Sequence, residues 1–502
     1  EGVSYLDYVE GIYVGYKWYE TADAEGYWDD VDNEYGKGYN GVVQYPFGYG
    51  LSYAQFDWIV KGWEKTDTTI SVTVVVENKT DFPAQEVVEL YYTPKYEKGG
   101  LEKAAVNLCA FAKTATPVEK GHPQELTLSF DIQDMASYDQ DRDGGKYVLE
   151  DGTYEISLRT DSHNIVRTAG GSATYKYTVG SDVVYDSYNG SNGTEKIHNL
   201  FTGDGISDKV AIDGSNTNQN IKWLSRENFE ETFPKVKAEA RSWNTSDLLQ
   251  KTNLFTRELS DEWEKAHADE APITTDAKNN ITVYDGKKVN SVGLTYGNPE
   301  NYDNKEMWDK LLDQLSINEM TQLVLHAYVH EEALPSIGKP QTAAVDGPSQ
   351  IGSFNQSNAG VGYPMPTLLG QSWNAELSKS YGLAVGKETK DTNRNGWYAP
   401  GVNLHRSAFG GRNYEYYSED PVHSGIMCAQ TVRGALNAGV YTYIKHFIGY
   451  DQESMRDGLY CWLTEQTLRE TYLRPYKIAV DEGATGVMSS YGRLGAVWSG
   501  GS

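Results

Sequence analysis

From Trp308 onward, the chain alternates stretches of helical periodicity with short apolar runs that are typical of strands. The clearest apolar runs are YTYIKHF and GVMSSY, and the helical stretches begin near Trp308, Asn374, Asp420 and Thr464. Short, continuous apolar runs indicate parallel strands that are buried on both faces. Such strands, each followed by a helix, predict an incomplete (β/α)8-type barrel over residues 301–502.

Two of the expected helices carry N-terminal capping signals. Asn374 is a favourable N-cap, and the pair Asp420-Pro421 offers an N-cap followed by proline at the first helical position. Gly439 marks the end of the helix that begins at Asp420. A turn at Ser316 is expected to divide the helical stretch that begins at Trp308.

The N-terminal part of the chain has a different organisation. Residues 56–178 contain short runs of β-forming residues separated by turns, and this pattern predicts a β-sandwich. Within it, the alternation of Ile70, Val72, Val74 and Val76 marks a strand with one buried face. Residues 1–55 lack helical periodicity and are expected to form an extended connector. Residues 179–300 are expected to form an irregular segment draped over its neighbours.

Composition narrows the classes of partner. The balance of 44 Lys and Arg against 71 Asp and Glu gives a net charge of −27, which argues against nucleic acid or an anionic membrane. Three widely separated cysteines form neither a zinc pattern nor a disulfide framework. No run of about 18 apolar residues is present, so we expect no membrane span here. The ends at Glu1 and Ser502 carry no start or stop feature, and we expect a fragment truncated at both ends.

Asp346 follows the small, apolar run AAV and precedes a Gly-Pro turn. Its carboxylate oxygens can accept hydrogen bonds from adjacent hydroxyl groups of a sugar. The alternative is that Asp346 caps the turn, as Asp often does before Gly-Pro. The sequence leaves both roles equally open.

Arg412 follows two glycines that allow a ligand to approach the backbone. Its planar guanidinium can donate hydrogen bonds to a sugar hydroxyl and to a carboxylate at the same time. The alternative is an internal salt bridge with Glu415, Glu419 or Asp420. We expect Arg406 to take such a structural role instead.

Lys445 and His446 lie at the end of an apolar run, where a buried cation is costly unless a partner or a function compensates. Side chains of adjacent strand residues point to opposite faces, so both can reach one pocket where the strand ends. We interpret them as pocket residues, with a core pair as the alternative. Tyr491, after GVMSS, has a similar position, and its alternative is a core tyrosine.

Two patterns resemble metal sites. The first has the spacing of a calcium-binding loop, with Asp139, Asp141, Asp143, Gly144 and Glu150 at the expected positions. Its flanks are strand-like, and Lys146 stands where an aliphatic residue is usual, so we expect a solvated hairpin loop instead. His326 and His330 lie four apart on an expected helix but lack the pattern H-E-x-x-H. We therefore expect no metal at either pattern, and no organic cofactor is implied.

Several motifs together resemble those of glycoside hydrolase family 3, and most of all its β-glucosidases. They are EGIYVGYKWYE, YPFGYGLSY, AVDGP, NLHR, GGRNYEYYSEDP, IKHF, LRETYLRPY and VMSSYGRLGAVWSGG. The resemblance covers most of the chain except about residues 179–295. It implies that the sandwich is fibronectin type III-like and that residues 1–55 hold the tail of an α/β sandwich domain. This order resembles family members with a C-terminal barrel.

The resemblance also implies which residues form the site. Sugar contacts fall on Asp346, Arg412, Lys445, His446 and Tyr491. Family members are retaining enzymes, whose two carboxyl groups lie roughly 5 Å apart. By the family pattern, the nucleophile is expected after Ser502 and the acid/base before Glu1, so no catalytic carboxylate is expected in this chain. The loop KHFIGYDQE lacks the glycine-histidine pair of the family's β-N-acetylglucosaminidases, which disfavours that subgroup.

These features predict a retaining β-glucosidase that hydrolyses terminal β-linked glucose from oligosaccharides or glycosides. The chain alone is expected to be inactive. The alternatives are a β-xylosidase or mixed-specificity glycosidase and, from another class, a non-catalytic carbohydrate-binding protein. Oligomeric state does not follow from the sequence, and a secreted or cell-surface location is as compatible with it as a cytoplasmic one.

Overall fold

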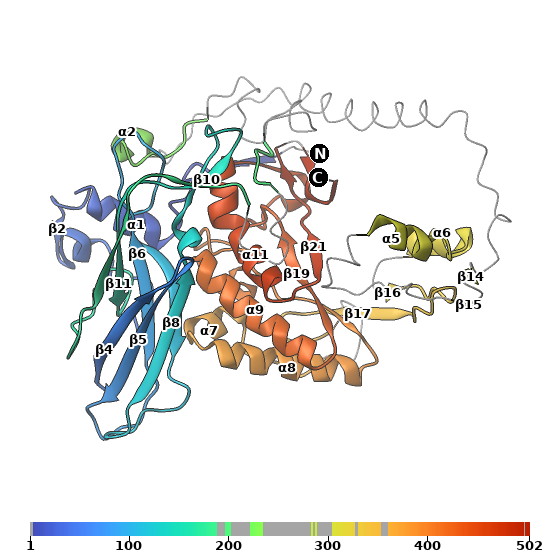
Figure 1. Ribbon diagram of the computed structural model, residues 1–502, viewed down its shortest axis with the longest axis horizontal. Helices are drawn as coiled ribbons and strands as arrows, with labels where there is room; N and C mark the ends of the chain where they lie inside the picture. Colours follow the sequence, from blue (N-terminus) through green and yellow to red (C-terminus); the bar gives the residue numbers. More distant parts are fainter. Residues whose placement is uncertain are drawn as a thin grey trace.

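The computed structural model describes residues 4–187, 196–201, 221–233, 283–284, 287–288, 304–326, 330–352, 360–495 and 497–501. Most of the segment 179–300, for which the sequence predicts an irregular course, lies outside these residues. Among the residues described, no helix is both long and apolar enough to cross a bilayer. The chain forms a β-sandwich beside a mostly parallel sheet that is flanked by helices (Figure 1).

The β-sandwich pairs a three-stranded sheet in the order β4-β5-β8 with a four-stranded sheet in the order β12-β11-β6-β7. The buried face expected for β5 is confirmed, because Ile70, Val72, Val74 and Val76 are at most 1% exposed in the sandwich core. The strands are β4 Phe56–Lys65, β5 Thr69–Asn78, β6 Val87–Thr93, β7 Asn107–Lys113, β8 Gln124–Asp131, β11 Gly152–Arg159 and β12 Thr174–Val179.

A small third sheet joins β9 Ser137–Asp139, β10 Lys146–Leu149 and β13 Val183–Tyr185 in the order β13-β10-β9. The strands β9 and β10 are antiparallel, with Lys146 opposite Asp139. The acidic segment that matches a calcium loop in spacing therefore connects the two strands of a hairpin, as the sequence predicts.

The second part of the molecule is built on a five-stranded sheet in the order β16-β17-β18-β19-β21. The neighbours β17, β18, β19 and β21 pair in parallel, whereas β16 is antiparallel to β17. The run YTYIKHF forms β19, and the first four residues of GVMSSY form β21. The expectation of burial on both faces is wrong for β21, in which Val487 is 45% exposed. The bounds are β16 His330–Glu331, β17 Thr342–Asp346, β18 Gly396–Tyr398, β19 Tyr441–Phe447 and β21 Gly486–Ser489.

Helices α7 Pro366–Gln371, α8 Ala375–Asp391, α9 Pro421–Asn437 and α11 Arg474–Asp481 flank this sheet. Both predicted N-caps are confirmed: the Asn374 side chain accepts from the Leu377 amide, and Asp420 accepts from the amides of Val422 and His423. The fourth expected helix is divided into α10 Glu465–Thr467, a π-helical turn over Leu468–Tyr472 and α11.

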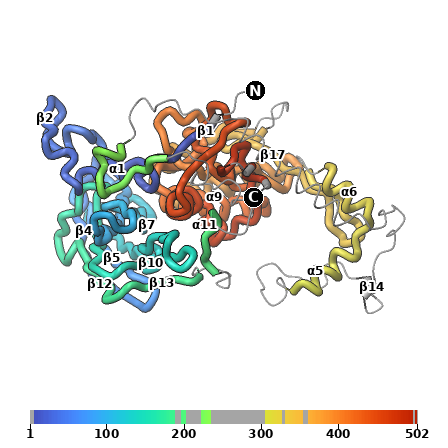
Figure 2. The backbone as a smooth tube through the Cα atoms, turned by 90° about the horizontal axis from the view of Figure 1, so that it is seen from above, coloured from blue at the N-terminus to red at the C-terminus, as the bar shows by residue number. Residues whose placement is uncertain are grey.

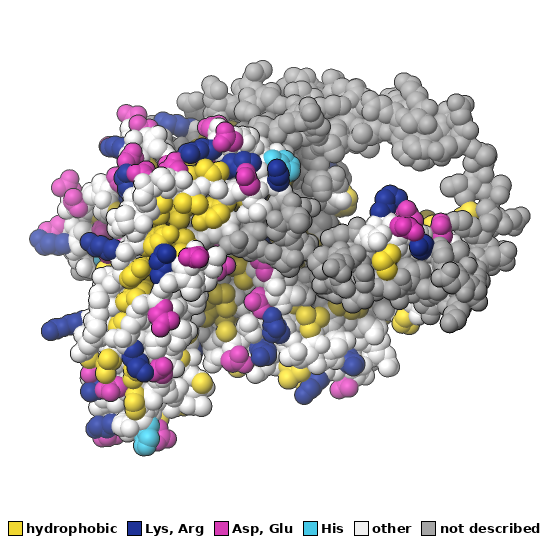
Figure 3. All heavy atoms as spheres, viewed as in Figure 1, with side chains coloured by type: hydrophobic (Ala, Val, Ile, Leu, Met, Phe, Trp, Pro, Cys, Tyr) yellow, Lys and Arg dark blue, Asp and Glu magenta, His cyan; other side chains and the backbone are white. Residues whose placement is uncertain are grey.

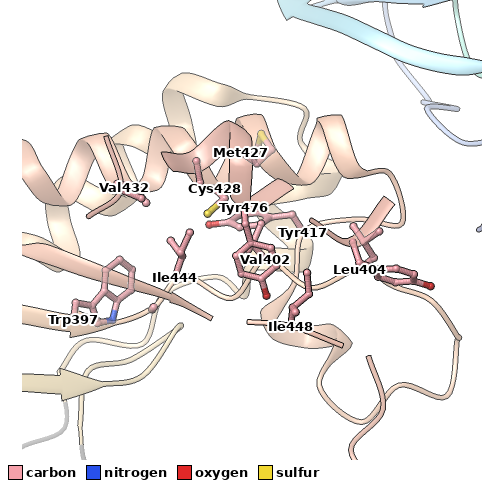
Figure 4. Packing of buried hydrophobic residues seen from close by; sticks show 14 of the residues in the cluster. Trp397, Val402, Leu404, Tyr417, Met427, Cys428, Val432, Ile444, Ile448 and Tyr476 are labelled. Carbon is pink, nitrogen blue, oxygen red and sulfur yellow. The ribbon is translucent and has the colours of Figure 1, made fainter. Parts of the chain in front are cut away.

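The contact between α8 and α9 depends on glycine. A Cβ added to Gly382 would lie 2.0 Å from the Thr431 carbonyl oxygen, and one added to Gly434 would lie 2.1 Å from that of Lys379. The two backbones therefore approach more closely than any other residue would allow. Trp397, Ile444, Cys428 and Tyr476 come from β18, β19, α9 and α11 and lie together in one core (Figure 4).

The N-terminal segment adds a strand and a helix. Strand β1 Ser4–Asp7 pairs in parallel with β20 Leu459–Trp462, in a sheet completed by β22 Arg493–Leu494 and β23 Val497–Trp498. Residues Tyr16–Ala24 form α1, so the expectation that residues 1–55 lack a helix is wrong. The buried face of α1 includes Glu20 and Thr21, whose hydrogen bonds to other segments replace the apolar periodicity that normally reveals a helix.

The predicted break near Ser316 is confirmed, since α5 Lys305–Leu312 is followed by α6 Ile317–His326. Both helices lie at the end of the molecule opposite the sandwich (Figures 1 and 2). His326 ends α6 whereas His330 begins β16, so the expectation that the two histidines lie on one helix is wrong. The described residues also include the short elements β2 Asp32–Asn33, β3 Gly36–Lys37, α2 Phe229–Thr232, β14 Val283–Tyr284 and β15 Lys287–Lys288.

Candidate functional site

Four of the five predicted site residues meet at the carboxyl ends of the parallel strands. Asp346 is the last residue of β17, and Lys445 and His446 lie at the end of β19. Arg412 lies on the loop that follows β18 and connects it to α9. Parallel strands end at the same edge of a sheet, which is where β/α folds bind their ligands.

Lys445 and Asp346 form the central ion pair of this edge. The Lys445 ammonium lies 2.7 Å from Asp346 Oδ1, and its side chain is 2% exposed. The same Oδ1 accepts a hydrogen bond of 2.7 Å from the Gly347 amide, so Asp346 also caps its own turn. The Asp346 side chain is still 36% exposed and can be reached by a ligand.

A second carboxylate lies behind the first. Glu415 has no exposed surface, and it forms a short ion pair with the Arg412 Nε. Its Oε2 lies 3.8 Å from the Lys445 ammonium. Two cations, Lys445 and Arg412, therefore face two carboxylates across the site.

Arg412 remains charged in these surroundings. Burial by itself would lower the pKa of its guanidinium, but the hydrogen bond and negative charge of Glu415 raise it above the ordinary value. The guanidinium also lies 5.7 Å from the centre of the Tyr450 ring. The internal salt bridge that the sequence left open is thus present, and it holds Arg412 at the edge of the sheet.

His446 is a neutral group held at two points. Burial, followed by the positive charges of Arg412, Lys445 and Arg456, lowers its pKa well below the ordinary value. The amide of His446 donates to Asn403 Oδ1 at 2.6 Å, and Asn403 Nδ2 donates to the His446 carbonyl oxygen at 3.1 Å. Its Nδ1 lies 3.2 Å from the Tyr416 hydroxyl. When Nδ1 accepts that hydroxyl hydrogen, Nε2 carries the ring proton and can donate it.

Tyr491 differs from the other four because it lies at the rim. It is 56% exposed, so it is not a core tyrosine. The Arg456 guanidinium lies 5.0 Å from its ring centre, and the rings of Tyr450 and Tyr491 are 6.5 Å apart. Tyr450 thus lies between Arg412 and this exposed aromatic residue.

Arg406 takes the structural role that the sequence predicts. It pairs with Glu10, with an Nη2–Oε2 distance of 2.8 Å, and lies 4.3 Å from the Tyr8 ring centre. The contact joins the loop after β18 to the N-terminal segment, away from Lys445.

The sequence did not reveal Glu415 and Asn403 as site residues. The sequence offers Glu415, three residues after Arg412, as one of its salt-bridge partners, but its position behind Lys445 depends on how the loop folds back. Asn403 opens the NLHR motif on the same loop, but its uncharged side chain does not indicate the two hydrogen bonds to His446. Among the residues described, no three or more His, Cys, Asp or Glu side chains form a group that could hold a metal.

Two parts of the chain match known domain families. Residues 313–497 match the glycosyl hydrolase family 3 N-terminal domain, and residues 86–162 match the fibronectin type III-like domain. The first match contains every predicted site residue, and the second contains the sandwich strands β6, β7, β8 and β11.

Several relatives match almost the whole chain. β-Glucosidase A of Butyrivibrio fibrisolvens is 28% identical over 97% of this chain and 55% of its own length. A β-glucosidase of Ruminococcus albus is 28% identical over 99% of this chain and 46% of its own length. The crystal structure of a β-glucosidase from Paenibacillus barengoltzii superposes with a TM-score of 0.63 and 26% identity over 98% of this chain and 48% of that chain. The chain thus spans about half the length of these relatives.

Proposed function

We propose that this chain, a glycoside hydrolase family 3 protein similar to β-glucosidases, forms the sugar-binding wall of a retaining β-glucosidase. Its substrate would be a terminal, β-linked glucosyl residue of an oligosaccharide or glycoside. The proposal rests on the convergence of Asp346, Lys445, Arg412 and His446 at one edge of a parallel sheet.

The chemistry of this edge suits a neutral, hydroxyl-rich ligand. The partly exposed Asp346 carboxylate can accept hydrogen bonds from hydroxyl groups, while Lys445 and the neutral His446 can donate to them. Arg412 adds planar donors whose direction is set by Glu415. On the face shown in Figure 3, acidic and basic side chains are interspersed, and the net charge of −27 disfavours a polyanionic ligand.

These residues bind and orient a sugar but do not cleave its glycosidic bond. In a retaining reaction one carboxylate attacks the anomeric carbon and a second carboxyl group protonates the leaving oxygen, then activates water. We propose that both groups belong to parts of the protein outside this chain, in the remainder of an incomplete barrel and in an α/β sandwich domain. The matches to the two bacterial relatives, which include both the sandwich and the parallel sheet, support this domain order.

Replacing Asp346 tests the proposal. In the full reading frame, Asp346→Ala should lower kcat/KM on an aryl β-glucoside at least about a hundredfold, because the sugar loses its orientation at the reacting centre. The matched control is Asp481→Asn, which removes an exposed Lys–Asp pair on α11 and should leave turnover unchanged. Near-normal kinetics in a folded Asp346→Ala enzyme would contradict the site assignment.

The alternatives predict different outcomes. A β-xylosidase would turn over an aryl β-xyloside at least as well as the glucoside. A non-catalytic binding protein would bind glucose through the same residues, yet the full reading frame would hydrolyse neither substrate. Comparing both substrates with the full-length protein therefore separates the three functions.

A further inference from the structure

Glu415 is a buried carboxylate whose two oxygens have unequal partners. One oxygen forms the short pair with Arg412 Nε. The other, Oε2, is buried without a hydrogen-bond partner among the described residues, and it lies 3.8 Å from the Lys445 ammonium. An unsatisfied buried carboxylate oxygen is costly, so its position beside a cation requires a physical explanation.

On the other side of Lys445, the Oδ1 atom of Asp346 already accepts two hydrogen bonds. Asp346 Oδ1 accepts from both the Lys445 ammonium and the Gly347 amide, each at 2.7 Å. A carboxylate has about four acceptor positions, two on each oxygen, so these two donors fill Oδ1. Asp346 can accept adjacent sugar hydroxyls with both of its oxygens only if the Lys445 ammonium leaves Oδ1.

Glu415 provides an acceptor for the displaced ammonium. A charge-assisted N–H···O bond is about 2.7–2.9 Å long, so Lys445 would need to move only about 1 Å toward Oε2. Its side chain is long and flexible with three donors, and such a shift keeps the ammonium paired throughout. The Glu415 carboxylate itself is held in place by Arg412.

We propose that Glu415 is a positioning residue that accepts the Lys445 ammonium when a sugar occupies Asp346. The inference deepens the proposed function and rests on it. In the sugar-free state Lys445 neutralises Asp346, and in the bound state it pairs with Glu415 and points its remaining donors at the sugar. Arg412 and Lys445 are thereby both oriented by one carboxylate.

A structure of the wild-type chain with glucose tests this directly. We expect glucose hydroxyls on both oxygens of Asp346 and a Lys445 Nζ–Glu415 Oε2 distance of about 2.9 Å. Bound glucose with the Lys445–Asp346 contact intact and Oε2 still remote would overturn the inference while leaving the proposed function standing. If glucose does not bind at millimolar concentration, the proposed function fails and the inference fails with it.

Glucose titrations of Glu415→Gln provide a second test. The amide keeps the shape but removes the charge, so we expect glucose affinity to fall about tenfold, the size of one charged hydrogen bond. In its glucose complex, Lys445 should remain on Asp346. The control Glu482→Gln removes an exposed Arg–Glu pair and should bind as the wild type does. Unchanged affinity in a folded Glu415→Gln chain would contradict the inference, and the wild-type structure decides the matter if the variant does not fold.

Discussion

Lys445 and His446 are adjacent in one strand, yet the side chains of both contact residues at the same edge of the sheet. In a regular strand their side chains would point to opposite faces. The pairing of β19 with β21 loses its register between Lys445 and Phe447, with His446 at the irregularity. Irregular pairing of this kind redirects side chains, so Lys445 reaches Asp346 while His446 contacts Tyr416 on the adjoining loop.

Asp451 lies just beyond this strand and introduces a pH dependence at the residue scale. It is buried and accepts hydrogen bonds from the Leu404 amide and the Tyr8 hydroxyl. Burial raises the pKa of its carboxyl to about 7, whereas an unfolded Asp titrates near about 3.9. Between these values the folded protein retains a proton that the unfolded chain has lost, so the contribution of Asp451 to stability falls as the pH rises.

Asp451→Asn should therefore stabilise the protein increasingly toward high pH. Asparagine keeps the shape and can hydrogen-bond both partners without a charge. The stabilisation of the variant relative to the wild type, measured as the increase in its free energy of unfolding, should be about 2–3 kcal/mol larger at pH 8 than at pH 5. Urea unfolding at both pH values measures the difference. The control is Asp457→Asn on the same loop, where the side chain is 85% exposed and no pH-dependent gain is expected.

How much of the site could be predicted follows from the kind of signal each residue gives. Asp346, Arg412, Lys445 and His446 are charged or titratable residues at strand ends or after glycines, so the sequence alone indicated them. The sequence indicates Glu415 only as a salt-bridge partner of Arg412, because its contact with Lys445 joins two segments that are distant in sequence.

At the scale of elements, the N-cap residues of α8 and α9 contribute differently to stability. Asn374 caps α8 at a partly exposed position with one hydrogen bond to the Leu377 amide. Asp420 caps α9 in a fully buried position, where it accepts from the Val422 and His423 amides and from the Tyr16 hydroxyl. The second cap therefore also binds α9 to α1.

We expect Asp420→Ala to lower the free energy of unfolding by about 2–4 kcal/mol, because it removes a cap and leaves the buried Tyr16 hydroxyl without its acceptor. Asn374→Ala should cost about 1 kcal/mol, the usual value for a cap. Equilibrium unfolding in urea compares the two variants. Equal losses would show that the Tyr16 contact adds nothing to the cap.

The same elements show why part of the fold could be predicted. The strands β19 and β21 and the helices α8 and α9 carry local signals, namely apolar runs and capping residues. The strands β1, β18 and β20 are three or four residues long and are specified by pairing with distant partners, as Tyr5 pairs with Tyr460. Helix α1 buries polar residues such as Glu20, and its stability comes from contacts beyond the helix.

At the scale of the whole molecule, the sandwich is joined to the parallel sheet by direct hydrogen bonds and by aromatic contacts of α9 and the N-terminal segment. Lys113 on β7 donates to the Ser372 carbonyl at 2.6 Å, and the Tyr138 amide donates to Glu470 at 2.5 Å. Near the first contact, the His423 ring of α9 lies within aromatic contact of Phe47, Phe111 and Trp373, with ring centres 6.1, 5.2 and 4.3 Å away. Three segments of the chain thus meet around one histidine.

His423 should make this junction sensitive to acid. Burial lowers its pKa to about 3, whereas an unfolded His titrates near about 6.5. Between these values the unfolded chain binds a proton that the folded protein does not, so stability decreases as the pH falls from about 6.5 to about 3. The loss through this group should reach about 2 kcal/mol at pH 5.

His423→Leu should remove that loss, so the difference in free energy of unfolding between pH 7 and pH 5 should shrink by about 2 kcal/mol relative to the wild type. His122→Leu, at a side chain that is 80% exposed on the sandwich, should leave the difference unchanged. An equal pH dependence in wild type and His423→Leu would show that the histidine is not the acid-sensitive group.

The contribution of Asp451 to stability falls as the pH rises, and that of His423 falls as the pH decreases. The double variant Asp451→Asn/His423→Leu should therefore have a flatter pH profile of stability than either single variant.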